Sequence, residues 1–439
     1  TISERRWALA FFRGLGEVVA IAFVATNDWA ANPALWNPIT RLGQAIQAPL
    51  PSLPGDFLNP NVAGGVMALL LPLGVGLTVG ARQERRWTAW GLLTAVAMAL
   101  GILLATSRGA WVALGGTLFL AALWGIARRV SGARRRVGAF IGLTALVGLV
   151  GALLLALAPA LRREVLGSEA LANRLRIFSQ AALLVRDYPF TGSGLGAFPL
   201  VHSTYALLIH VPVLSHAHAL PLDIAVEQGV FGALAALIVW CGAGWLGLQA
   251  LVDREDRGPQ PVLAAGLASL SVLIIHGLSD DALYSSRGVF LMWAPVGMIA
   301  ASVRGWDNGG STKRRGGRRW WPMMLVGLLA LLGLFWRPLA AAWQANMGAV
   351  RQTIDELRAY DYHRFNDLSL DQIRRQDDLS TARAYFQRAL ALDPRQATAR
   401  TRLTQIALAR GDYGMALEHA EICWEAGHRD RVSRLMLGD

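Results

Sequence analysis

Long apolar runs are the feature that most constrains how this chain can fold. In membrane hydrocarbon only helices and closed barrels satisfy every backbone N–H and C=O group, and runs this long without alternation are helices. A helix needs about 20 residues to cross roughly 30 Å of hydrocarbon. The predicted fold class is therefore all-α, a polytopic membrane helical bundle. About nine spans are expected, near residues 7–26, 61–80, 87–106, 109–127, 138–158, 220–249, 262–280, 287–304 and 321–338.

The composition supports a membrane protein. Of the 439 residues, 54% are hydrophobic and 16% are charged, and the mean hydropathy is +0.38, too apolar for a water-soluble protein of this length. The net charge of +12 comes from arginines clustered between apolar runs, so nucleic acid is not an expected partner. Cys241 and Cys423 form no CxxC pattern, which argues against a metal site or a disulfide framework. Residue 1 is Thr and no cleavable signal peptide is evident, which favours a fragment lacking earlier spans.

Positive charge predicts the orientation of the spans. Basic residues mark alternate connections, which are therefore cytoplasmic; they are Arg82, Arg85, Arg86, Arg128, Arg129, Arg134 to Arg136, Arg254, Arg257, Lys313, Arg314, Arg315, Arg318 and Arg319. The other connections are then external, at residues 27–61, 107–109, 159–220, 279–287 and after 338. We expect a membrane domain over residues 1–338 with an external catalytic loop at 159–220. A helical domain over residues 339–439 follows on the same side.

The external loop contains most of the polar chemistry. Connections in compact proteins are usually about 4 to 6 residues long, so a loop of this length is more than a connector. Arg174 and Arg176 carry guanidinium groups that bind phosphate oxygens in a bidentate fork; attraction to anionic lipid headgroups is the alternative. His216 and His218 suit proton transfer or hydrogen bonding to a diphosphate. A metal is not expected, because neither an HExxH motif nor a cysteine partner accompanies them.

Further candidates lie in the turns. Gly194 and Gly196 belong to a glycine-rich turn whose N–H groups could bind an anion, although the glycines could also serve only a tight reversal. Asn61 begins a span, either as part of a helix-capping turn or as a substrate contact. Arg108 lies between two spans on the side opposite the basic clusters, and either an anion or a lipid phosphate is its expected partner.

The C-terminal region repeats a pattern of small residues. Ala382, Phe386 and Ala389 recur after an offset of 34 as Ala416, Ala420 and Cys423. An offset of about 34 residues is the tetratricopeptide period. The pattern predicts a tetratricopeptide-like helical region that offers a surface to a protein partner, and a purely structural cap is the alternative.

The ordered motifs together resemble the O-antigen ligase and O-antigen polymerase superfamily over about residues 55–305. They are Asn59-Pro60-Asn61, Ser107-Arg108-Gly109, Arg174 upstream of Pro189 and the Gly192 to Gly196 turn, and His218 followed by Gly229 and Gly232. Ala219 departs from the Asn, Ser or Gln that is usual after this histidine in the ligases. The resemblance implies a metal-independent, inverting glycosyltransferase without a cofactor, in the bacterial cytoplasmic membrane. Its donor is a glycan on undecaprenyl diphosphate, and its acceptor is a hydroxyl of a glycan, lipid or protein at the outer face.

The resemblance also implies roles for individual residues. Arg108 and Arg174 would bind the diphosphate, with Arg176 as a second candidate, and His218 would activate the acceptor or steady the diphosphate. Two other classes of function stay open. A polysaccharide or lipid transporter would place charged or broken helices at the bilayer midplane, and a non-catalytic envelope scaffold would act through the C-terminal repeats.

Overall fold

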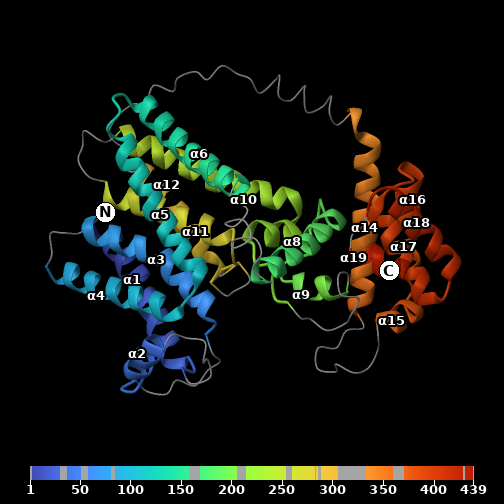
Figure 1. Ribbon diagram of the computed structural model, residues 1–439, viewed down its shortest axis with the longest axis horizontal. Coiled ribbons are helices and arrows are strands. Elements are labelled where there is room, and N and C mark those ends of the chain that lie inside the picture. Colours follow the sequence, from blue (N-terminus) through green and yellow to red (C-terminus); the bar gives the residue numbers. More distant parts are fainter. Residues whose placement is uncertain are drawn as a thin grey trace. The chain divides into compact units, whose positions relative to one another are not determined.

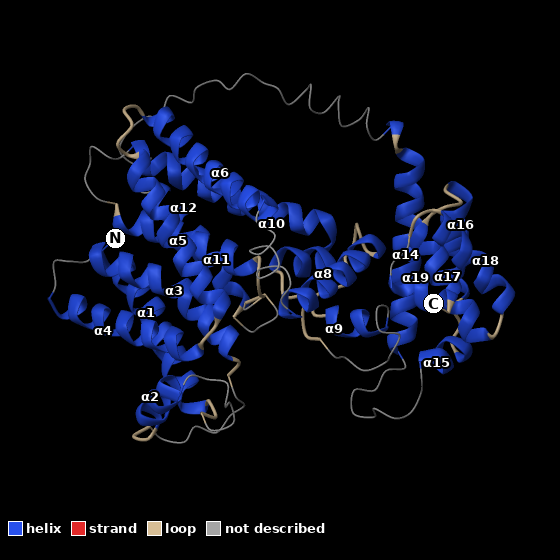
Figure 2. Ribbon diagram, viewed as in Figure 1, coloured by secondary structure: helices blue, strands red, loops and turns tan. Residues whose placement is uncertain are grey.

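The described part of the chain is all helical, as the sequence predicts. The structure is a computed structural model that describes residues 2–29, 37–50, 58–80, 85–157, 169–204, 214–253, 260–281, 283–284, 288–304, 333–358, 370–428 and 431–438. Every regular element in these ranges is a helix (Figures 1 and 2). The elements pack as two compact units, which are described separately below.

The first unit comprises Thr1–Arg174, His218–Leu220 and Ala236–Ser311. Its helices are α1 (Ile2–Thr26), α2 (Asn37–Gln47), α3 (Pro60–Gly80), α4 (Arg85–Ala105), α5 (Arg108–Ala127), α6 (Ala133–Leu157), the second part of α10 (Leu220–Asp253), α11 (Pro261–Gly277), the short 3-10 helix η3 (Val289–Trp293) and α12 (Ala294–Arg304).

Four helices in the described residues are long and apolar enough to cross a membrane; they lie at Pro60–Gly80, Arg86–Ala105, Arg108–Ala127 and Leu220–Asp253. These confirm four of the predicted spans as helices. Pro261–Gly277 and Val289–Val303 are shorter apolar helices, and α1 and α6 cover two further predicted runs. Most of the run at 321–338 and the basic residues at 254, 257 and 313–319 lie outside the described residues. The total of nine spans and their orientation stay predictions.

Helix α3 lies at the centre of the first unit and packs against α1, α4, α5 and α11. Close approach is possible because a Cβ at Gly76 would lie 2.1 Å from Ala265 Cβ, so only glycine fits at this crossing of α3 and α11. Ser269 Oγ on α11 also donates to the Leu69 carbonyl at 2.7 Å. Large apolar side chains face outward on the surrounding helices, for example Leu118, which is 71% exposed, and Leu149, which is 66% exposed. An apolar exterior around a packed interior suits a lipid environment.

The second unit comprises Leu175–Ala217, Pro221–Ala235 and Thr312–Asp439. It contains most of α8 (Glu169–Asp187), α9 (Phe198–His202), the first part of α10, and the C-terminal helices α14 (Trp336–Arg358), α15 (Leu370–Gln376), α16 (Ser380–Leu392), α17 (Ala397–Arg410), α18 (Tyr413–Glu425) and α19 (Arg431–Leu437). One buried cluster joins α8, α9, α10, α14 and α19; its members include Ala181, Tyr188, Val201, Val226, Ala349 and Val432. The C-terminal helices therefore share a core with helices of the predicted catalytic loop.

The small residues that repeat in the sequence are buried in two C-terminal helices. Ala382, Phe386 and Ala389 are the buried residues of α16. Ala416, Ala420 and Cys423 are the buried residues of α18. The tetratricopeptide assignment stays a prediction, although its key positions all face a helical core.

Helix α10 is broken at Gly229, where the sequence suggested one continuous span. Gly229 has φ 72° and ψ −180°, a conformation outside the helical region. The loop fills the break: Ser193 N donates to the Val226 carbonyl at 2.8 Å, and Val230 N donates to the Pro189 carbonyl at 2.8 Å. Gly192, with φ 67°, lies so close that a Cβ would be 2.2 Å from the Glu227 carbonyl oxygen. The two glycines therefore allow the loop backbone to pair with the broken helix.

We predict that Gly229→Ala destabilises the protein by roughly 1–3 kcal/mol, because alanine at positive φ is strained. Its Cβ would also lie 2.8 Å from the Phe190 carbonyl oxygen. Thermal unfolding of purified protein in detergent measures the loss. Gly242→Ala is the matched control on α10, since a Cβ there meets nothing within 4 Å. Equal unfolding temperatures for the two variants would contradict the strained break.

A buried ion pair in the second unit makes stability depend on pH. Arg374 Nε lies 2.6 Å from Glu356 Oε1, and both side chains are buried. Burial by itself raises the pKa of Glu356, but Arg374, with help from Arg402 and Gln352, holds this pKa below its usual value of 4.5. A lowered pKa in the folded state contributes stability above the unfolded value of 4.5, and this contribution is lost as the pH falls through the folded value.

We therefore expect Glu356→Gln to lose about 3–5 kcal/mol at neutral pH, the cost of breaking a buried pair. The difference from the wild type should shrink as the pH falls below about 4.5, because the wild-type carboxylate also becomes neutral. Unfolding temperatures measured between pH 7 and 3 test this. Glu421→Gln is the control, since Glu421 is exposed on α18. A pH-independent difference would refute the assignment.

Candidate functional site

The turn before α5 presents Arg108 beside the end of α11. Ser107 caps α5, and its Oγ accepts from Ala110 N at 3.4 Å, while the exposed Arg108 is the first residue of the helix. A Cβ at Gly109 would lie 3.3 Å from His276 Nε2 and 3.2 Å from Ser279 Oγ. A Cβ at this position would be tight against its neighbours, so glycine eases the contact between the turn that carries Arg108 and the end of α11.

Arg174 reaches the same place from α8. Its guanidinium donates a hydrogen bond to the Ser279 carbonyl, just beyond the C-terminus of α11. The last carbonyl groups of a helix lack partners within the helix and carry partial negative charge, so a cation is favourable there. A guanidinium has five N–H donors, and this bond leaves donors for a further anion.

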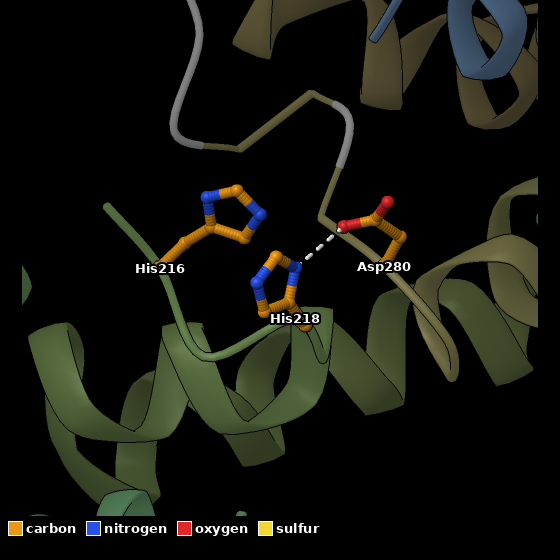
Figure 3. Close-up of side chains that lie close together, drawn as sticks. All are labelled: His216, His218 and Asp280. Atoms are coloured by element: carbon orange, nitrogen blue, oxygen red, sulfur yellow. Dashed lines mark hydrogen bonds and ion pairs between the residues drawn. The ribbon is translucent and has the colours of Figure 1, made fainter. Parts of the chain in front are cut away.

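His218 forms a pair with Asp280 in the turn after α11. Its Nδ1 lies 3.1 Å from Asp280 Oδ1. Figure 3 marks this contact with a dashed line. The His218 side chain is 30% exposed, whereas that of Asp280 is 6% exposed. His218 also has φ 57°, an uncommon value for a residue other than glycine. Strained backbone of this kind clusters at functional sites.

The pair determines which nitrogen of His218 is available for chemistry. An ionised carboxylate only accepts hydrogen bonds, so the proton facing Asp280 is assigned to Nδ1. Nε2 is then the unprotonated nitrogen, able to take a proton from a hydroxyl group. This arrangement matches that of a general base oriented by a carboxylate. His216, His218 and Asp280 each offer one atom that could bind a metal, and these atoms lie within 4.8 Å of one another (Figure 3). A structural zinc site has four protein ligands and a catalytic one has three.

Asp280 is a residue that the sequence analysis missed. Its backbone N donates to the His276 carbonyl at 2.9 Å, and its Oδ1 accepts from Asp281 N at 2.9 Å, so the carboxylate is fixed by the turn itself. A signal was present in the sequence. Two acidic residues and His276 follow an apolar run, and ionisable residues at the end of a span are candidates for function.

Two cavities adjoin these helices in the first unit. A small one of about 20 Å³, sufficient for one water molecule, is lined by His276, Asp280 and Asp281 among others. A larger apolar one of about 690 Å³ lies between α5, α6, α10 and α11; its lining includes Thr117, Trp124, Phe140, Trp240, Trp245 and Ile274. Its volume is in the range of small-molecule sites, about 300–1,000 Å³.

The other predicted residues have different surroundings. Arg176 is exposed on α8, two positions after Arg174. His216 precedes His218 by two residues, and its Nδ1 lies 2.7 Å from Ser215 Oγ. Asn61 is exposed at the start of α3, and its backbone N donates to Asn59 Oδ1 at 2.8 Å.

Some backbone N–H groups of the glycine-rich turn donate to carbonyl groups of the protein itself. Gly194 N donates to the Glu227 carbonyl at 3.1 Å, next to the break in α10. Gly196 has φ 71° and nothing within 4 Å of a Cβ, so its left-handed backbone serves the turn rather than a close contact. This geometry favours a tight reversal over an anion cradle at Gly194; a substrate contact by either glycine stays a prediction.

Comparison with known proteins agrees with the motifs. Residues 93–237 match the family model described as O-antigen ligase. A search of curated proteins found no match. The matched segment includes Arg108, Arg174 and His218, whereas Asp280 and the C-terminal helices lie beyond it. The match supports the O-antigen ligase and polymerase family and, with it, a glycosyltransferase-like enzyme in a membrane.

Proposed function

We propose that this chain transfers a glycan from an undecaprenyl diphosphate carrier to an acceptor hydroxyl at the outer face of the bacterial cytoplasmic membrane. The reaction is metal-independent and inverts the anomeric carbon. The observation that carries the proposal is the meeting of three groups at one short turn. Arg174 binds the Ser279 carbonyl, His218 pairs with Asp280, and the Arg108 turn packs against Ser279 through Gly109.

His218 supplies the base. The acceptor hydroxyl oxygen attacks the anomeric carbon from the side opposite the diphosphate, and its proton passes to His218 Nε2. The carbon–oxygen bond to the diphosphate breaks, and its electron pair leaves with the phosphate oxygen. Asp280 stabilises the imidazolium that forms, because its carboxylate faces the Nδ1–H. Proton transfer of this type contributes about 10²–10⁴-fold to rate.

Positive charge supports the departing diphosphate. Negative charge develops on the leaving oxygen, and donors already in place near it lower the barrier without reorganisation. Arg108 and Arg174 provide guanidinium groups, with Arg176 as the second loop candidate, and the N-terminus of α5 at Arg108 adds its partial positive charge. His216, Asn61, Gly194 and Gly196 are proposed as further substrate contacts around them.

The apolar cavity suits the lipid part of the donor. Its lining includes Thr117 and Trp124 of α5 and Ile274 of α11. Arg108 is the first residue of α5, and His276 follows Ile274 by two residues on α11. A polyprenyl chain entering between them would keep its diphosphate at the site. Residues 339–439, on the same external side, are proposed to offer a tetratricopeptide-like surface to a protein partner.

The break in α10 does not favour a transporter. Transporters use broken helices to bind substrates with freed backbone groups near the midplane. Here the Val226 and Glu227 carbonyls accept from Ser193 and Gly194 of the loop, so the break serves to dock the loop.

We predict that His218→Ala lowers glycan transfer by about 10²–10⁴-fold, the contribution of a general base, with unchanged protein level. Asp280→Asn should lose at least about 10-fold, because an amide neither fixes the tautomer nor stabilises the imidazolium. Surface polysaccharide in a strain that lacks the chromosomal copy, together with an immunoblot of the protein, measures both effects. His419→Ala, which removes an imidazole from α18, is the control. Full retention of polysaccharide in the His218 variant would exclude the proposed chemistry.

The two site arginines give a separate test. Arg174→Lys keeps the positive charge but loses the planar guanidinium, which can bind a phosphate and the Ser279 carbonyl at the same time. We therefore expect slower but measurable glycan transfer. Arg174→Ala and Arg108→Ala should each lose roughly 10²-fold or more. Transfer from a polyprenyl-diphosphate donor in isolated membranes measures this order. Equal activity of the alanine and wild-type proteins would contradict a diphosphate at this position.

A further inference from the structure

A buried ion pair fixes the end of α8 to the C-terminal helices. Asp187 is the last residue of α8, and its Oδ2 accepts from Arg402 Nε of α17 at 3.0 Å, with both side chains buried. Thr398 Oγ1 donates to Asp187 Oδ1 at 2.7 Å. A carboxylate is unfavourable at a helix C-terminus, which carries partial negative charge, and a buried carboxylate requires a partner. Arg402 supplies a positive charge and Thr398 a hydrogen bond.

The next residue joins the same network. Arg402 also donates to the Tyr188 hydroxyl at 2.8 Å, and that hydroxyl lies 2.6 Å from Thr353 Oγ1 of α14. The guanidinium carbon stands 5.6 Å from the centre of the Tyr188 ring. Burial raises the pKa of Tyr188, so the hydroxyl stays protonated and can donate to Thr353.

A buried asparagine of α14 binds the backbone that follows. Asn346 Oδ1 accepts from Phe190 N at 3.0 Å and from Thr191 N at 3.3 Å, and its Nδ2 donates to Thr191 Oγ1 at 2.8 Å. Asn346 is fully buried. We call Asn346, Thr353, Thr398 and Arg402 the clamp. The clamp binds residues 187–191 through polar groups that have been removed from water.

The clamped segment connects the two helices that lead to the proposed reacting groups. α8 is one continuous helix of 19 residues, and Arg174 precedes Asp187 on it by 13 positions, a distance of about 20 Å. On its other side the segment pairs with the broken α10 through Pro189, Ser193 and Gly194. α10 begins two residues after His218. A small tilt at the clamped end of a rigid helix becomes a larger displacement at its far end.

We propose that the C-terminal helices fix α8, the helix that carries Arg174, for the reaction, with Arg402 and Asn346 as positioning residues. The role of Arg174 in the reaction rests on the proposed function. The clamp residues lie outside the segment that matches the O-antigen ligase model. The C-terminal helices are thus a working part of the enzyme in addition to any surface they offer to a partner.

The test compares Arg402→Met with the wild type in full-length protein in detergent. Methionine keeps the apolar length but removes the guanidinium that bonds Asp187 at 3.0 Å, which leaves this buried carboxylate with the Thr398 hydroxyl and with Arg186 Nε at 3.9 Å. Amide hydrogen exchange, read by mass spectrometry, should be on the order of 100-fold faster in residues 175–194, and unchanged in α3. Arg402→Lys should recover part of the protection. Arg400→Met is the matched control on α17, because the Arg400 side chain bonds Pro394 and His419 and not Asp187.

The same variants are then tested for binding of undecaprenyl diphosphate. We expect about 10-fold weaker binding for Arg402→Met, equivalent to about 1.4 kcal/mol, and wild-type binding for Arg400→Met.

If Arg402→Met does not accumulate, the double variant Asp187→Asn, Arg402→Met removes both buried charges and should still show faster exchange in residues 175–187.

The outcomes separate the clamp from the proposed function. Faster exchange confined to α17, with α8 as protected as in the wild type, overturns the clamp. Faster exchange of α8 with unchanged binding also overturns it, because the helix would then not position the diphosphate site. A wild-type protein that does not bind undecaprenyl diphosphate contradicts the proposed function, and the exchange result alone then decides whether Arg402 fixes α8.

Discussion

The turn that ends α11 is the constraint on which the candidate site depends. Its Ser279 carbonyl lies just beyond the end of the helix and accepts from Arg174. Its Asp280 carboxylate is buried and accepts from His218. Two adjacent residues of the turn thus bind a guanidinium and an imidazole. Stability and chemistry use the same contacts.

Glycines make the approach to this turn possible. Gly109 faces His276 and Ser279 at distances at which a Cβ would be tight, so glycine lets the Arg108 turn lie against the end of α11. Gly192 and Gly229 have a related role in the second unit, where positive φ values let the loop backbone pair with a broken helix. In both places a missing side chain allows backbone groups to meet, and polar residues nearby take their positions from that contact.

The sequence predicted the class of fold better than it predicted the surroundings of the candidate residues. Apolar runs indicated helices because the length and uniformity of such a run depend only on local sequence. Arg108, Arg174 and His218 were recognisable by charge and by motif. Asp280 was missed because its role depends on a long-range pairing with His218, 62 positions away, which no local pattern contains. The break at Gly229 was also missed, since a glycine within an apolar run does not reveal its φ value.

The C-terminal helices show a second limit of predictions made from local sequence patterns. Their repeated small residues predicted helices and buried positions correctly, and Ala382 and Ala416 are indeed buried. The buried partners of Asp187 could not be read from the sequence, because Arg402 lies 215 positions away in the chain. A pattern of small residues describes how helices pack with one another. It carries no information on which distant polar group they will bind.

The central claim is that His218 and Asp280 act as one unit on the acceptor hydroxyl. A double-mutant cycle tests it most directly, with rates of transfer from a polyprenyl-diphosphate donor for His218→Ala, Asp280→Asn and the double variant. Residues that act as a unit are strongly non-additive. We predict that the double variant is no slower than His218→Ala alone. Losses that multiply, so that Asp280→Asn slows the His218→Ala protein as much as it slows the wild type, would contradict the account.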